Sequence, residues 1–136
     1  MMSPILALRR AILDVAESDA ELSALMGGAL RLFDETPRDA SPVYAVFGDV
    51  KATDWSTGSD HGYEQNLSLV VWSQEGSARS GLSVAERFAD ILHDAPLTLE
   101  GHRLVNLRVT EIASERDKDS RLIRVIVRLR AVTETA

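Results

Sequence analysis

The chain contains no cysteine, few aromatic residues and no long apolar run. The absence of cysteine excludes disulfide frameworks, thiolate zinc sites and thiol catalysis. No stretch approaches the roughly 20 apolar residues that a bilayer span requires, so no membrane partner is expected. Basic residues are also in deficit, since 15 Lys and Arg stand against 21 Asp and Glu for a net charge of −6. This balance argues against a protein that holds nucleic acid by neutralising phosphates.

The length and the apolar content describe one compact unit. A chain of 136 residues with 45% apolar content can bury roughly two-thirds of its unfolded surface, so it needs no structural metal to fold. No repeat, linker or low-complexity tract divides it. We therefore expect a single domain over residues 1–136.

Two substantial helices are expected. Ser3 followed by Pro4 is a helix start, and an apolar stripe follows it. A second short helix should end at Gly27. The other main helix begins at Ser77 or Ser83 and ends at Pro96. The apolar stripe of the first helix comprises Ile5, Leu8, Ile12 and Val15.

Period-two alternation predicts about five strands, which lie near residues 31–33, 43–50, 64–74, 103–114 and 121–132. Helix and strand runs are segregated, which favours an α+β fold. We expect a mostly antiparallel sheet with the two main helices packed on one face. The polar segment 51–63, in which Trp55 is the exception, predicts a long hairpin connection or mobile arm.

The sequence shows no catalytic, metal or cofactor site. The three histidines, His61, His93 and His102, lack partners at ligand spacing. His93 falls at a predicted helix end, where we expect it to interact with the last carbonyls. There is no phosphate-binding glycine loop and no nucleophile elbow. An enzyme is therefore not expected.

The last strand has an unusual pattern. One face is apolar, whereas the other carries Arg124, Arg128 and Arg130. These arginines either pair with Glu111 or other nearby carboxylates, or form a polar interface between subunits. A stripe that grips DNA is a third alternative, which the negative charge disfavours.

Several segments together resemble the tail-terminator (tail-completion) family of long-tailed bacteriophages, prophages and gene transfer agents. The resemblance covers nearly the whole chain and includes an Arg-rich last strand after an acidic hairpin. Its motifs are Asp54-Trp55-Ser56-Thr57, Leu67-Ser68-Leu69-Val70-Val71-Trp72-Ser73, Leu92-His93-Asp94-Ala95-Pro96-Leu97 and Gly101-His102-Arg103-Leu104. The turn at residues 117–120 lacks the glycine often found there.

The resemblance implies a structural virion protein located at the head–tail junction and assembled in the bacterial cytoplasm. Such proteins form a homohexameric ring that caps the head-proximal end of the tail tube. The implied partners are the tail tube protein, a head-completion or stopper protein, and double-stranded DNA that passes through the lumen without sequence-specific binding. Alternatives are another neck component or, from a different class, a small-molecule-binding α+β protein or enzyme.

The candidate interface residues belong to two groups. The polar arm with its tryptophan anchor is the kind of segment that orders on meeting a neighbour. The arginine row suits a partner's carboxylates. The residues are Asp54, Trp55, Ser56, Thr57, His61, Arg124, Arg128 and Arg130.

Overall fold

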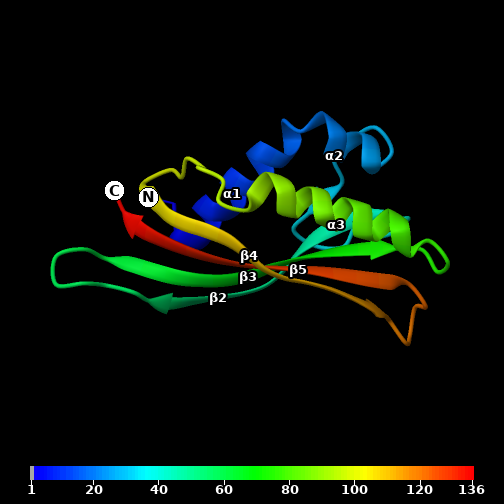
Figure 1. The fold of residues 1–136 in the computed structure, drawn as a ribbon. Coiled ribbons are helices and arrows are strands. Elements are labelled where there is room, and N and C mark those ends of the chain that lie inside the picture. Colours follow the sequence, from blue (N-terminus) through cyan, green and yellow to red (C-terminus); the bar gives the residue numbers. More distant parts are fainter. Residues whose placement is uncertain (1) are drawn as a thin grey trace.

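The computed structural model describes residues 2–136 and has three helices on one face of a five-stranded sheet (Figure 1). This arrangement confirms the predicted α+β class. No helix among the described residues is long and apolar enough to cross a bilayer. The elements are α1 (Pro4–Glu17), α2 (Ala20–Leu25), β1 (Leu32–Phe33), β2 (Tyr44–Asp54), β3 (Gly62–Ser73), α3 (Ala78–Leu92), β4 (His102–Arg116) and β5 (Ile123–Thr135).

The sheet has the order β1-β2-β3-β5-β4. The short β1 pairs with β2 in parallel, and all other pairs are antiparallel. Two hairpins, β2–β3 and β4–β5, therefore meet along the central pair β3 and β5. Their turns extend from opposite ends of the sheet, and the helices cover its middle (Figure 1).

Helix α1 begins where the sequence predicts it. The Ser3 hydroxyl oxygen accepts a hydrogen bond from the Leu6 amide at 3.1 Å, and Pro4 occupies the first turn, where its missing N–H costs nothing. Leu8 and Ile12 of the predicted stripe are buried. The buried Gln65 side chain donates to the Pro4 carbonyl at 3.1 Å. This bond joins the start of α1 to β3.

Helix α3 begins at the first of the two predicted positions. Ser77 is its N-cap residue, whereas Ser83 lies inside the helix. The helix ends at Leu92 and not at Pro96, because His93 already has an extended backbone. Gly81 allows the helix to approach the sheet closely, since a Cβ there would lie 2.8 Å from the Cβ of Ser73. The buried face of α3 thus packs directly on β3 and β5.

The predicted hairpin arm is confirmed, but the prediction that its connection spans residues 51–63 is wrong. β2 continues to Asp54 and β3 starts at Gly62, so the connection spans only residues 55–61. The polar residues of this segment pair across the hairpin, with Lys51 opposite Asn66 and Thr53 opposite Glu64. The arm is therefore a β-hairpin that extends beyond the helices (Figure 1).

Candidate functional site

The tip of the β2–β3 hairpin is an ordered turn. The Asp54 carboxylate accepts hydrogen bonds from the hydroxyl and the amide of Ser56, and these bonds hold the pKa of Asp54 below its usual value. The Trp55 amide donates to the Gly62 carbonyl at 2.9 Å, and the Thr57 amide donates to the Asp60 carbonyl at 2.9 Å. Four consecutive residues of the predicted interface, 54–57, thus lie together on one exposed turn.

The tip is joined to β5 by aromatic and polar contacts. The Arg130 guanidinium lies 5.5 Å from the centre of the Trp55 ring, and its Nη2 donates to Glu64 at 2.9 Å. The carbonyl of His61 accepts a hydrogen bond from the Thr135 amide at 2.9 Å. The Trp55 side chain is still 50% exposed. The structure therefore brings Trp55 and Arg130 together and leaves Trp55 half exposed.

The remaining arginines lie farther along the face of β5 that the helices do not cover. Arg128 Nε donates to Glu111 at 3.1 Å, and Arg124 forms an ion pair with Glu115. The prediction that this row pairs with nearby carboxylates is confirmed. Its role in a subunit interface stays a prediction. Because each of the three arginines has a glutamate partner, the row presents alternating charge and not a cationic stripe.

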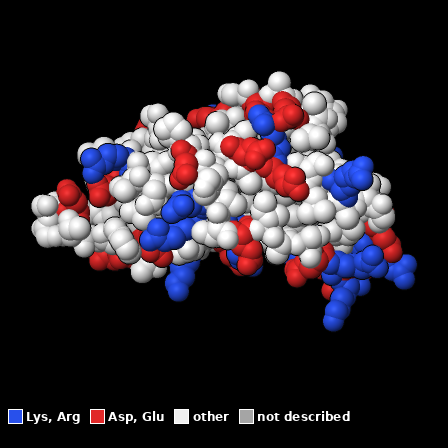
Figure 2. All heavy atoms as spheres, in the orientation of Figure 1, with Lys and Arg blue, Asp and Glu red and all other residues white. Residues whose placement is uncertain are grey.

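The turn of the β4–β5 hairpin, which the resemblance describes as an acidic hairpin, also carries a cluster of three cations. Arg116, Lys118 and Arg121 border an open hollow of about 460 Å³ beside this turn. Figure 2 shows these blue side chains gathered at the right end of the molecule. The Asp117 carboxylate, which accepts from the hydroxyl and amide of Ser120, closes the turn. The signal for the cluster was present, since its three cations stand within six residues.

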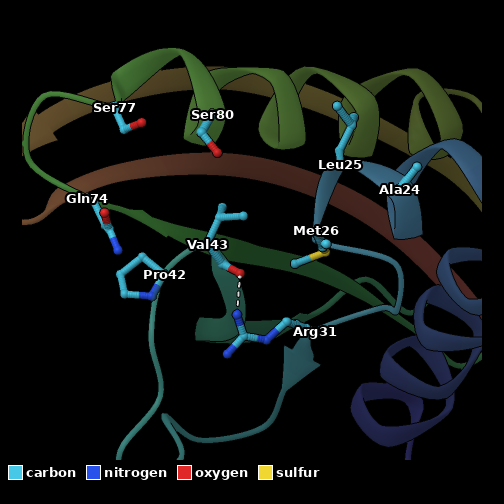
Figure 3. Close-up of a pocket in the computed structure, with 10 residues that line it drawn as sticks. Ala24, Leu25, Met26, Arg31, Pro42, Val43, Gln74, Ser77 and Ser80 are labelled. Atoms are coloured by element: carbon cyan, nitrogen blue, oxygen red, sulfur yellow. Dashed lines mark hydrogen bonds between the residues drawn. The ribbon is translucent and has the colours of Figure 1, made fainter.

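A second hollow, of about 430 Å³, lies where the end of α2, the start of β2 and the turn before α3 meet (Figure 3). Arg31 is the charged residue among its lining residues. The guanidinium donates to the carbonyls of Ser41 at 2.7 Å and Val43 at 3.0 Å, so it anchors the segment before β2. No acid–base pair or activated nucleophile lines this hollow within the described chain.

The histidines have structural contacts. His93 is the C-cap residue of α3, as predicted, but its ring contacts β4 and not the last helical carbonyls, because its Nδ1 accepts a hydrogen bond from the Val109 amide at 3.0 Å. His102 Nε2 lies 2.8 Å from the Met2 carbonyl. Across residues 2–136, no group of three or more His, Asp and Glu side chains is placed to hold a metal ion.

These features are typical of a protein that works by assembly with other chains. The polar side chains are used in turns, in ion pairs on an open sheet face and at two protruding hairpin ends. Such features supply surfaces for other protein chains.

The comparisons agree with this class. The family model described as tail completion protein gp17 matches residues 10–134, and the chain belongs to that family. It is therefore a structural protein of a phage-type tail, with its place in the virion. This confirms the resemblance inferred from the sequence motifs.

Solved structures share the fold. A chain in the virion of a native gene transfer agent particle is 24% identical, with a TM-score of 0.88, and the match covers 98% of this chain and 99% of that one. A second solved structure is 19% identical with a TM-score of 0.56, over 100% of this chain and 97% of that one. No curated protein matches the sequence.

Proposed function

We propose that the protein is the terminator of a phage-type tail, acting as one unit over residues 1–136. Six copies form a ring on the head-proximal end of the tail tube, and this ring stops tube growth and joins the tail to the head. The observation that carries the proposal is the match to the tail completion family over residues 10–134. The sheet with hairpins at opposite ends supports it, because each copy has two different surfaces to present to its neighbours.

The partners follow from this position. One face of the ring would contact the tail tube protein, and the other a head-completion or stopper protein. Double-stranded DNA would pass through the lumen, and a net charge of −6 suits passage because fixed cations would trap phosphates. The protein acts by assembly, without turnover and without a cofactor.

The proposed interface residues are those of the hairpin tip and the arginine row. Trp55 at the tip is half exposed and is the natural anchor for a neighbouring chain. Each of these arginines pairs with a glutamate of its own chain. Its planar guanidinium can donate at the same time to a carboxylate of a partner chain. The residues are Asp54, Trp55, Ser56, Thr57, His61, Arg124, Arg128 and Arg130.

Removal of the gene tests the proposed function. Particles made without the protein should separate into DNA-filled heads without tails and tubes of uncontrolled length, as seen by negative-stain electron microscopy. Expression of the protein from a plasmid should restore joined particles of uniform tail length. Normal particles without the protein would disprove the proposal. Uniform tails beside unjoined heads would instead identify a head-completion or stopper protein.

The substitution Trp55→Ala should separate assembly from folding. Half of this side chain is exposed, and its described contact is a cation–π interaction with Arg130 worth about 0.5–1 kcal/mol at such a site. The free energy of unfolding should therefore change by no more than about 1 kcal/mol, while the fraction of joined particles falls.

Chemical denaturation of the purified variant and particle counts would measure the two effects. Ser59→Ala, an exposed position on the same turn and outside the proposed interface, is a control for disturbance of the tip. A large loss of stability in Trp55→Ala would show that the indole is a folding residue and not an interface anchor.

A further inference from the structure

Each outer edge of the sheet is covered for only part of its length. On the β2 side, β1 pairs with Ala45 and Val46 alone, and the rest of the outer edge of β2 has no strand beside it in residues 2–136. A bulge between Phe47 and Val50 separates the covered part from the uncovered part. Beyond the bulge lies an uncovered run of five residues, 50–54.

The β4 edge is divided in the same way. The connection after α3 covers its middle, because the Asp94 amide donates to the Leu107 carbonyl at 2.8 Å and the Val109 amide donates to His93. A second bulge follows, between Val109 and Glu111. Beyond it, no described segment pairs with the outer edge of residues 112–116. This run also has five residues.

We infer that residues 50–54 of one copy pair in antiparallel register with residues 112–116 of the next copy, so that the sheets of neighbouring subunits join into one. The inference rests on the proposed ring and specifies its contact. Unpaired strand edges are templates for addition of another strand. Because β2 and β4 of one copy run in opposite directions, continuation of the sheet makes the new pair antiparallel, as inside the subunit.

One register places all five residues of each run opposite each other and keeps their faces aligned. It puts Val50 opposite Arg116, Ala52 opposite Ser114 and Asp54 opposite Ile112 on the helix-covered face. On the open face, Lys51 then lies opposite Glu115, and Thr53 opposite Ala113. Lys51 has no ion-pair partner within the described chain, whereas Glu115 is half exposed, so the pairing is also complementary in charge.

Exposed apolar side chains flank both edges on the helix-covered face. Ile112 of β4 is 38% exposed, and Leu6 of α1 is 55% exposed beside an apolar hollow of about 280 Å³ between α1 and β2. The start of α1 lies beside the uncovered run, because Gln65 pairs with Ala52 and also bonds the Pro4 carbonyl. In the inferred register Ile112 of one copy lies opposite Asp54 of the next, and Ile112 loses exposed apolar surface when the strands pair.

The two runs lie at opposite ends of the sheet, near the two hairpin turns (Figure 1). Their pairing therefore requires each copy to be displaced along the strand direction relative to the previous one. A sheet that closes on itself needs such a stagger, which is accompanied by strand tilt. The covered parts of β2 and β4 thus permit a closed ring of staggered subunits. They disfavour a flat, open sheet that continues from one subunit to the next.

Disulfide cross-linking tests the register, and the absence of native cysteine makes the readout clean. The double variant Thr53→Cys/Ala113→Cys changes no charge. Facing residues of an antiparallel pair have Cα atoms roughly 4.5–5.5 Å apart, which suits a disulfide. Within one copy, the two positions are three strand spacings apart across the sheet and also lie at different ends of their strands, so their separation exceeds about 14 Å and an internal bond is excluded.

Oxidised particles should give a ladder of covalent multimers up to the hexamer in a non-reducing gel. Lys51→Cys/Glu115→Cys should give the same ladder. The control Thr53→Cys/Ser114→Cys, whose second cysteine points to the other face, should give no ladder. Electron microscopy of the same particles, before oxidation, shows whether rings are present.

The outcomes separate the two proposals. Joined particles of normal tail length without a ladder in either facing pair would overturn the edge contact and leave the terminator function standing. A ladder in the control as strong as in the facing pairs would also overturn the register. Failure of the unaltered protein to occur in particles would overturn the terminator function, and the edge contact with it.

Discussion

Replacement of Phe88 by alanine is expected to lower the free energy of unfolding by about 3–5 kcal/mol. Phe88 is fully buried and is the largest of the fully buried side chains. It lies on the face of α3 that packs against the sheet. Truncation would remove its transfer free energy and leave a cavity that the surrounding strands cannot close, because β3 and β5 are held by pairing on both sides.

Urea denaturation followed by circular dichroism would measure this loss. Glu86→Ala, on the exposed face of the same helix, is the matched control and should change stability by no more than about 0.5 kcal/mol. The Phe88 loss is a large share of the 5–15 kcal/mol typical of a domain, so the variant should also reduce particle assembly. A Phe88 effect no larger than that of Glu86→Ala would contradict the described packing of α3.

The core could be predicted from the sequence because burial leaves a periodic signal. Leu67, Leu69 and Val71 alternate along β3, and all three are buried under the helices as expected. The same alternation placed the arginines of β5 on the opposite face. Where a helix covers one side of a strand, the pattern of apolar residues follows the side-chain period directly.

The ends of the hairpins could not be predicted in this way. Lys51 and Thr53 lie in a paired strand that extends beyond the helices, so neither face of that strand must be apolar. Backbone pairing in such a region depends on the register of β2 with β3, and composition carries little information about it. Polar composition alone therefore predicts a connection that is longer than residues 55–61.

The candidate site was predicted as a set of residues but not as a set of contacts. Trp55 and Arg130 are far apart in the chain, and only the pairing of β3 with β5 brings them to 5.5 Å. The sequence indicates Glu111 as a partner for the arginines, but it gives no sign that Glu64 pairs with Arg130. The bond from Val109 to His93, which covers the middle of the β4 edge, depends on the exact end of α3 and had no local signal. Motif resemblance, by contrast, identified the family correctly.

The junction between α2 and α3 is expected to make stability depend on pH. The Asp19 carboxylate caps α2 by accepting from the Leu22 amide at 2.8 Å and accepts from Arg87 Nε and Nη2 at 2.8 and 2.6 Å. The hydrogen bonds from Arg87 are the main reason that the pKa of Asp19 lies below its usual value. The hydrogen bond from the Leu22 amide lowers this pKa further. The folded state thus binds a proton at Asp19 less readily than the unfolded chain does.

The sign of the effect follows from this difference. Because the pKa of Asp19 is lower in the folded protein, its charge contributes stability that is fully present above the pKa of the unfolded chain, near 4. This contribution is lost as the pH falls through the lower pKa of the folded protein. Asp19→Asn keeps a good capping side chain but removes the charge. Its deficit relative to the unaltered protein should therefore be largest at neutral pH and shrink as the solution is acidified below pH 4.

Asp19→Ala removes the cap as well as the charge. At neutral pH it should be less stable than Asp19→Asn by about 0.5–2 kcal/mol, the usual cost of an N-cap deletion, and this extra cost should persist in acid. Urea denaturation of the three proteins at pH 7 and at several values below 4 would measure both parts. Asp14→Asn, whose carboxylate forms an exposed ion pair on α1, controls for general loss of negative charge. An Asp19→Asn deficit that does not change with pH would show that the contact with Arg87 contributes no charge-dependent stability.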